Sequence, residues 1–385
     1  MDFITKTDFE RLSREIHPHC VSILMPTHYY GKEVNTLDDR ILFKKKLKDV
    51  SNQLLDYQLS ESQIKTYLKP AEDLIDNISF WRELSSGLAV YLHDDIFEVY
   101  KLPIDFEVYS YISNHFYLSP LLTYFSQNSN YYILSLSKKT CKLYDCSRYE
   151  INEVDTRGIL PEKIEDVVGY DFKEDYLGFR TSSGSYSPGS KMAIRGYSEV
   201  IDNDKIETEK FLRIIHNGLV KHIQNQNVLL VLACDETDYS IFKEISQYKM
   251  LYPEYINGNV DNDNISLLHS KANSLIDSYF KQSMEERKLF FNEAIEKSTS
   301  MFDEIVSGAV NGKIETLFVE KNKHIYGKFD MLKDKIEIHD QKKVNNVCLI
   351  NLAATETYMK GGKVFILKKE ELPITESSLN AILRY

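Results

Sequence analysis

The sequence predicts an α/β protein built from three domains. Short apolar runs typical of buried strands alternate with segments whose apolar residues recur at helical spacing. Gly (15) and Pro (9) are few in 385 residues, which excludes loop-built and low-complexity folds. This length suffices for two or three domains of ordinary size. We place the domains at residues 1–128, 129–277 and 278–385.

A capping-box pattern and an apolar run mark the start of the first domain. In Thr7-x-x-Glu10 the two side chains would satisfy free N–H groups of a helix that ends near Ile16. Cys20–Met25 is apolar and β-branched, which predicts a buried strand. The elements expected after it are a helix over Thr36–Tyr57, a helix opened by the capping box Ser60-x-x-Gln63, and strands at Gly87–Leu92, Ile96–Leu102 and Phe106–Ile112. Together they predict an N-terminal α/β domain.

The middle domain is expected to open as an antiparallel meander. Tyr131–Leu136, Thr140–Asp145 and Tyr149–Val154 read as short strands joined by tight polar turns. Further along, a capping box at Asp204 precedes an amphipathic helix, and Asn227–Cys234 reads as a buried strand of the parallel type. This order predicts a mixed sheet with helices on its faces.

In a long segment of the middle domain, Gly169–Val200, apolar residues recur at neither helical nor strand spacing. About thirty residues without regular secondary structure exceed the usual loop length of ~12–15 residues in compact domains, and such loops tend to be functional or disordered.

The third domain returns to alternating helices and strands. We expect helices over Met284–Lys297, Ser300–Val310 and Val347–Tyr358, a helix end near Gly361, and strands at Ile314–Val319, His324–Phe329, Ile336–His339, Lys363–Leu367 and Asn380–Arg384.

The long segment has the residue types of an RNA-facing arm. Basic side chains suit phosphate contacts, tyrosine suits base stacking, serine hydroxyls donate hydrogen bonds, and glycine permits close backbone approach. The candidate RNA-binding residues are Arg180, Ser182, Ser183, Gly184, Ser185, Tyr186, Lys191 and Arg195. A surface loop without a ligand is the competing interpretation. Part of the segment, Gly184–Lys191, is a near match to a phosphate-binding loop, but Ser190 and Lys191 stand in the wrong order and Pro188 lacks an N–H, so we do not favour nucleotide hydrolysis.

Composition limits the partners and the compartment. Lys+Arg total 47 and Asp+Glu total 58, so the net charge is −11. Proteins that wrap long nucleic acid are usually basic, so this balance argues against that mode but permits a local basic patch. The five cysteines are scattered without a C-x-x-C, which argues against a disulfide framework or a zinc ribbon. With no signal peptide and no apolar run of about 18 residues, we expect a cytoplasmic protein without a membrane segment.

Two other groups of residues carry weaker hypotheses. Asp235, Glu236 and Asp238 follow a predicted strand and could hold magnesium, but carboxylates also begin helices, and we favour that interpretation. The ten histidines form no H-x-x-x-H with a Glu, and His17-x-His19 has no matching ligand pair. We therefore expect neither a metal site nor a cofactor.

Several segments together resemble a known family. Val21–His28 (V-S-I-L-M-P-T-H), Ser86–Leu92 (S-G-L-A-V-Y-L) and Leu379–Tyr385 (L-N-A-I-L-R-Y) resemble bacterial members of the archaeo-eukaryotic release factor superfamily. Ser307–Val319 and Gly361–Val364 are similar to parts of the release factor's third domain, whose fold is shared with the ribosomal L7Ae/L30e proteins. The resemblance implies an RNase H-like middle domain and an L7Ae/L30e-like C-terminal domain.

The sequence departs from this family at its catalytic motif. Class-1 release factors carry Gly-Gly-Gln in the middle-domain loop, whereas the one Gly-Gly of this chain, Gly361-Gly362, precedes Lys363. No catalytic residue can be transferred, so the resemblance implies a protein that binds the ribosome or a tRNA-like target in rescue, hibernation or stress control. We favour a binding protein over an enzyme. One alternative is a hydrolase of peptidyl-tRNA or RNA. Another is an adaptor whose C-terminal domain binds a protein partner.

Overall fold

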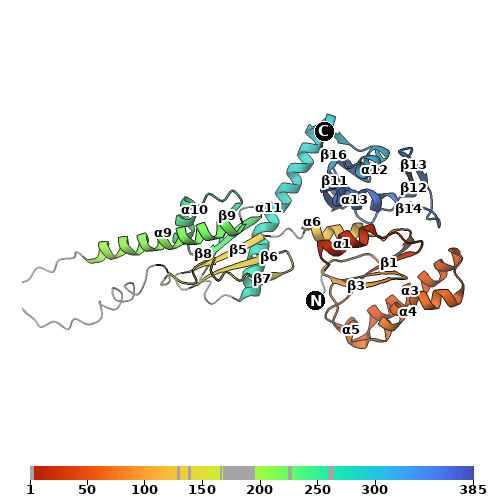
Figure 1. The fold of residues 1–385 in the computed structure, drawn as a ribbon, viewed down its shortest axis with the longest axis horizontal. Helices are drawn as coiled ribbons and strands as arrows, with labels where there is room; N and C mark the ends of the chain where they lie inside the picture. Colours follow the sequence, from red (N-terminus) through yellow and green to blue (C-terminus); the bar gives the residue numbers. More distant parts are fainter. Residues whose placement is uncertain are drawn as a thin grey trace, which may run out of the picture. The chain divides into compact units, whose positions relative to one another are not determined.

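The computed structural model describes residues 4–127, 131–137, 140–164, 167, 196–223, 228–258 and 264–385. They form a mixed α/β protein that divides into two compact units (Figure 1). The first unit combines Met1–Gln127 with Gln282–Tyr385, and the second, middle unit is Asn128–Lys281. The first and last parts of the chain thus pack together. The expected division into three domains stays a prediction, and its second boundary falls inside the helix α11 (Ile265–Glu293).

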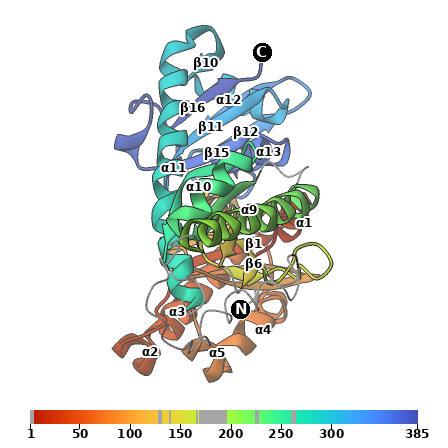
Figure 2. The same ribbon diagram turned by 90° about the vertical axis from the view of Figure 1, so that its left-hand side faces the viewer.

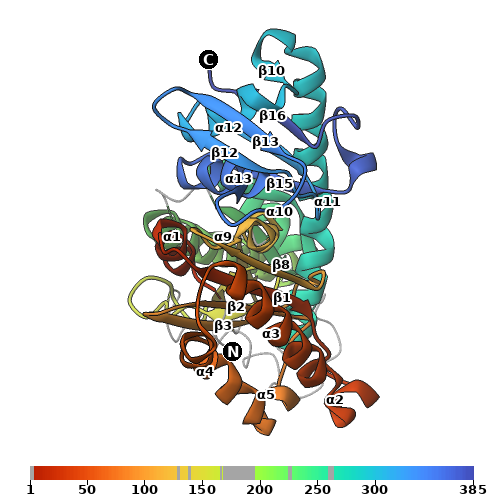
Figure 3. The same ribbon diagram turned by 90° about the vertical axis from the view of Figure 1, so that its right-hand side faces the viewer.

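The N-terminal part of the first unit is an antiparallel sheet with helices. Its elements are α1 (Lys6–Arg14), β1 (Cys20–Pro26), α2 (Lys32–Thr36), α3 (Asp38–Asp56), α4 (Glu61–Asp76), α5 (Ile78–Arg82), β2 (Gly87–His93), β3 (Ile96–Leu102), β4 (Tyr109–Ser113), the 3-10 helix η1 (Ser119–Leu121) and α6 (Leu122–Gln127). The strand order is β3-β2-β1-β4. Helices α3 and α4 lie side by side on one face of this sheet (Figure 3). Alternate residues of β1, Val21, Ile23 and Met25, bury their side chains against them.

Local hydrogen bonds explain where the first helices begin. The capping box of α1 is formed by Thr5 and Asp8, so the expectation that Thr7 and Glu10 form it is wrong. The Asp8 carboxylate accepts a hydrogen bond of 2.9 Å from the Thr5 N–H. The N-cap of α1 is therefore Thr5, two residues before the predicted Thr7. The capping box at Ser60 is confirmed, since its hydroxyl accepts from the N–H of Gln63.

The C-terminal part of the first unit holds two small sheets. After α11 come the 3-10 helix η3 (Ile295–Lys297), β10 (Ser298–Thr299), α12 (Phe302–Val310), β11 (Ile314–Glu320), β12 (Tyr326–Asp330), β13 (Lys335–His339), β14 (Val347–Cys348), α13 (Leu349–Met359), β15 (Lys363–Leu367), η4 (Lys369–Glu371) and β16 (Leu379–Leu383). The sheets have the orders β10-β16-β11-β15 and β13-β12-β14. Gly361, with φ of 78°, follows α13 in the left-handed conformation that glycine favours, as expected near this helix end.

The middle unit is a five-stranded mixed sheet. It contains β5 (Tyr131–Leu136), β6 (Cys141–Cys146), β7 (Ile151–Glu153), α9 (Gly196–Ile223), β8 (Leu229–Cys234), α10 (Glu236–Ile245), β9 (Leu251–Asn257) and the first part of α11. The order is β7-β6-β5-β8-β9, with β5, β8 and β9 parallel to one another and β6 antiparallel to both β5 and β7. The predicted meander and parallel strand are therefore confirmed.

Helices cover both faces of this sheet. Leu134 and Leu232 face α9 and α10, whereas Ile133 and Val231 face α11. Figure 2 shows α9 and α10 side by side in green. The predicted cap at Asp204 is wrong, because α9 already begins at Gly196.

None of the helices within the described residues is both long and apolar enough to span a membrane.

Candidate functional site

The RNA-binding residues predicted from sequence lie outside the described part of the chain. This holds for all eight of them: Arg180, Ser182, Ser183, Gly184, Ser185, Tyr186, Lys191 and Arg195. Their role as a cationic arm stays a prediction. The described residues next to this segment in the sequence, up to Val167 and from Gly196, belong to the middle unit, and we call residues 140–164 its base.

That base is anchored in the core of the middle unit. Leu160 and Ile164 are buried in the same cluster as Leu212 and Ile215 of α9. Helix α9 passes very close to this segment at Gly218, where a Cβ atom would lie 2.3 Å from the Ile159 carbonyl oxygen. The chain is therefore held against α9 just before the predicted arm begins.

Charged side chains surround a cavity of about 550 Å³ at this base. Lys142 lies 3.1 Å from Glu153, and Arg157 lies 2.6 Å from Asp155. The Arg157 guanidinium hydrogen-bonds to Asp155 and lowers the pKa of that carboxyl to about 2. Because these two cations are paired with carboxylates, they are poor candidates for phosphate contacts.

The carboxylates after β8 begin a helix. Asp235 is the N-cap of α10, and its Oδ1 accepts a hydrogen bond of 2.8 Å from the N–H of Asp238. Glu236 and Asp238 lie in the first turn, where negative charge is favourable. The interpretation of these residues as a helix start is confirmed.

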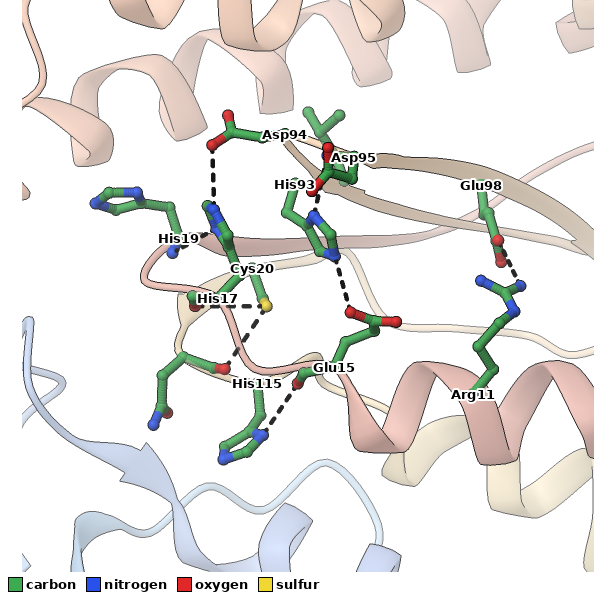
Figure 4. Close-up of polar contacts among 12 residues, drawn as sticks. Arg11, Glu15, His17, His19, Cys20, His93, Asp94, Asp95, Glu98 and His115 are labelled. Carbon is green, nitrogen blue, oxygen red and sulfur yellow. Dashed lines mark hydrogen bonds and ion pairs between the residues drawn. The ribbon is translucent and has the colours of Figure 1, made fainter.

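Four histidines gather in the first unit, at the end of the sheet where β1 begins and β2 and β4 end (Figure 4). They are His17, His19, His93 and His115. The rings of His17 and His93 are stacked, with centroids 4.9 Å apart and planes inclined by 14°. His17 Nε2 lies 3.1 Å from Asp94, and His93 Nε2 lies 3.3 Å from Glu15. Each stacked ring thus has a carboxylate partner of its own.

Main-chain groups fix the tautomers of the two stacked rings. His17 Nδ1 accepts from the N–H of His19 at 3.3 Å, and His93 Nδ1 accepts from the N–H of Asp95 at 3.2 Å. An accepting Nδ1 carries no proton, so each Nε2 carries one and donates it toward its carboxylate. A second proton on either ring would break a main-chain hydrogen bond.

Burial shifts two further groups of this histidine cluster, His19 and Cys20, toward their neutral forms. Burial and the neighbouring His17 lower the pKa of His19. Burial raises the pKa of the Cys20 thiol to about 12, so it is not a thiolate nucleophile. His19 and His93 line a cavity of about 670 Å³. Within the described ranges, no group of three or more His, Cys, Asp or Glu side chains could hold a metal ion.

Sequence reasoning missed this cluster. His17-x-His19 is visible as a spacing, but His93 ends β2 and His115 follows β4. Only the antiparallel register, which pairs Val21 with both Leu92 and Ile112, brings these segments together. No local sequence pattern carries that information.

Comparison with known proteins gives a family match for the middle unit. Residues 131–278 match the model of bacterial archaeo-eukaryotic release factor family 7. No curated protein matches this chain.

Distant similarities to solved structures extend along the chain. They include an archaeal translation termination factor, aRF1, with 14% identity over 100% of this chain and 99% of that chain and a TM-score of 0.24. Archaeoglobus fulgidus Pelota has 11% identity over 100% of this chain and 94% of that chain, with a TM-score of 0.31. S. cerevisiae Dom34, a translation termination-like factor, has 14% identity over 78% of this chain and 79% of that chain, with a TM-score of 0.32.

The family that the sequence resembles is thus the family whose model matches it. Residues 131–278 are thus similar to bacterial archaeo-eukaryotic release factors of family 7.

Proposed function

We propose that this chain is a translation factor that binds the ribosome, and that residues 169–195 of its middle unit contact RNA there. One observation carries the proposal: the family match over residues 131–278 includes the whole of this segment. Release factors place the corresponding loop beside the acceptor end of tRNA. The partner is therefore expected to be the ribosome or a tRNA-like target.

The charge distribution supports a role for the segment itself. Lys142 and Arg157 at its base are paired with carboxylates, and the chain as a whole is acidic. Phosphate binding by the middle unit would then depend on Arg180, Lys191 and Arg195. Nearby serine, glycine and tyrosine residues would approach the RNA backbone and bases.

The order of strands supports the expected RNase H-like identity of the middle unit. Three antiparallel strands, β7, β6 and β5, are followed in the sheet by the parallel strands β8 and β9. The L7Ae/L30e-like identity of the C-terminal part stays part of the proposal. We place the protein in rescue, hibernation or stress control rather than in termination, because the sequence contains no Gly-Gly-Gln.

Sedimentation of the purified chain with ribosomes across a salt series tests the proposal. The triple variant R180A/K191A/R195A should bind more weakly than the wild type. The slope of log K against log salt should also become less steep, by up to about two to three, since each phosphate contact contributes roughly 0.7–0.9 to that slope. The matched control K44A/K45A/K48A removes three exposed lysines from α3 and should leave binding unchanged. Equal binding and equal slopes for wild type and the first variant would refute the role of the segment.

The same proteins separate the enzyme and adaptor alternatives. Incubation with peptidyl-tRNA on ribosomes should release no peptide, whereas turnover would favour a hydrolase. If ribosome binding survives loss of the three basic residues, capture experiments with and without nuclease would reveal a protein partner of the C-terminal part instead.

A further inference from the structure

A second cavity of the first unit, of about 750 Å³, carries chemistry that the proposed function does not use. Its walls come from the end of α3, the segments before β1 and after β4, β12, and residues 344–347. We call it the α3–β12 cavity. Its volume is typical of sites that bind small ligands.

Lys342 does not itself line this cavity, but its ammonium group contacts two residues that do. Its Nζ is 3.3 Å from the hydroxyl of Tyr57 and 3.3 Å from the carbonyl oxygen of Asn346, two residues that line the cavity. A third bond of 3.0 Å goes to the carbonyl oxygen of Lys343. All three partners are uncharged oxygens, and the rings of Tyr57 and Tyr111 also face the ammonium group, with centroids at 6.0 Å and 5.2 Å, so none of these contacts supplies a negative charge. An anion in the cavity would supply the missing charge.

Other side chains that line the cavity suit a ligand that combines an anionic group with a polar ring. Lys328 of β12 adds a second cation, and Asp56 is the sole carboxylate among the described lining residues. His115 Nδ1 lies 3.2 Å from the carbonyl oxygen of Glu15 and donates to it, which leaves Nε2 as an acceptor. His19 also lines the cavity, and its ring packs edge-on against that of Tyr57, with centroids 5.6 Å apart.

Amide side chains complete the lining. Gln58, Asn114 and Asn345 each offer both a donor and an acceptor. This combination suits the hydrogen-bonding edges of a nucleobase, whereas aromatic surface from Phe329 suits its faces. Cations, amides and rings therefore converge from segments far apart in the sequence.

We propose that the α3–β12 cavity binds a nucleoside monophosphate unit, with the phosphate near Lys328 and Lys342 and the base against the amide and ring side chains. Such a unit could be a free nucleotide or an unpaired nucleotide of an RNA strand. This site is independent of the middle-unit segment.

The experiment is a calorimetric titration of the full chain carrying R180A/K191A/R195A, which removes the other proposed RNA contact. The probes are AMP, GMP, CMP and UMP, each alone, and a mixed-sequence single-stranded oligoribonucleotide. Within this background, K328A and K342M should each weaken binding by about tenfold or more, because each removes a charge-assisted contact. K333A is the matched control, since Lys333 is exposed and pairs with Asp330, which does not line the cavity. It should bind within twofold of the background protein.

Each outcome decides the proposal. Binding of mononucleotides that depends on Lys328 and Lys342 assigns a free nucleotide, and binding of the oligoribonucleotide alone with the same dependence assigns an RNA strand. Absence of binding to every probe at millimolar concentration overturns the proposal. Binding that neither substitution weakens also overturns it, because the ligand would then lie elsewhere. Neither result would bear on ribosome binding by the middle unit.

Discussion

Asn351 and Leu118 are 233 positions apart in the sequence, yet the side-chain oxygen of Asn351 accepts a hydrogen bond of 2.8 Å from the Leu118 N–H. The same oxygen accepts from the N–H of Ser119 at 2.8 Å, and the Asn351 amide donates to the Phe116 carbonyl at 3.1 Å. One buried side chain of α13 thus satisfies three main-chain groups of the N-terminal part. This contact helps to explain why the two ends of the chain form one compact unit.

Replacing Asn351 with Leu should lower the free energy of unfolding by about 3 kcal/mol or more. The substitution leaves two N–H groups and one carbonyl buried without partners, and each such group costs about 1–3 kcal/mol. Urea denaturation of the full chain measures the change. Asn345→Leu, at an exposed amide, should stay within about 0.5 kcal/mol of the wild type. A loss below about 1 kcal/mol for Asn351→Leu would show that these hydrogen bonds do not hold the unit together.

Local patterns predicted most elements, whereas pairing between distant segments could not be predicted. The run Cys20–Met25 identified β1 because six consecutive residues are apolar or small and a proline follows. The cap at Asp204 was wrong because Asp and Glu three residues apart also occur inside helices, as they do within α9. The contacts of Asn351 and the stacking of His17 on His93 depend on tertiary packing, which no local spacing encodes.

The histidine cluster should contribute to stability through packing and through its hydrogen bonds. His93 is 4% exposed, stacks on His17 and Phe116, and lies 3.3 Å from Glu15. His93→Ala removes this ring and should cost about 2–3 kcal/mol, measured by urea denaturation. Glu15→Gln retains an oxygen that can accept from Nε2, so it should cost less than about 1 kcal/mol. Equal losses in the two variants would mean that the charge of Glu15, and not ring packing, dominates.

Gly218 should be required for the packing of α9. An added Cβ would meet the Ile159 carbonyl oxygen at 2.3 Å, so the main chain of one segment must shift. Gly218→Ala should therefore destabilise the chain by about 1–3 kcal/mol, although alanine favours helices by about 1 kcal/mol. Thermal unfolding compares it with Lys221→Ala, an exposed position on the same helix that should change little. A stabilised Gly218→Ala variant would contradict the close approach.

The pair formed by His28 and Asp39 should make stability depend on pH. Asp39 Oδ1 lies 2.9 Å from His28 Nδ1, and this hydrogen bond raises the pKa of His28 above its usual value near 6.5. A histidine with a raised folded-state pKa contributes stability that is complete below the unfolded pKa and lost as the pH rises through the folded pKa. Wild type should therefore exceed His28→Gln in free energy of unfolding at pH 5.5, by about 0.5–1 kcal/mol, because solvent screens the half-exposed His28 although Asp39 is buried. The difference should shrink at pH 8.5, and a constant difference in urea titrations would exclude a protonated His28 as its source.

Lys342 should give the opposite dependence at alkaline pH. Burial lowers the pKa of this ammonium group to about 8, whereas an unfolded lysine titrates near 10.4. Between these values the unfolded chain binds more protons than the folded chain, so stability rises with pH. Relative to Lys342→Met, the wild type should gain about 1 kcal/mol between pH 7.5 and pH 10, after allowance for solvent screening of a half-buried group. Burial raises the pKa of the neighbouring Tyr57 to about 12, so that phenol stays neutral throughout.

Urea midpoints of wild type and Lys342→Met at pH 7.5, 8.5 and 10 measure this gain. Lys333→Met is the control, because the side chain of Lys333 is 77% exposed. The difference in stability between this variant and the wild type should be the same at all three pH values. At pH 7.5 Lys342→Met should be at least as stable as the wild type, since methionine keeps the packing and removes a buried charge. If Lys342→Met also loses nucleotide binding, then ligand binding explains why the chain retains a buried charge that lowers its stability. Parallel stability curves for wild type and Lys342→Met would instead mean that the ammonium group is solvated in the folded chain.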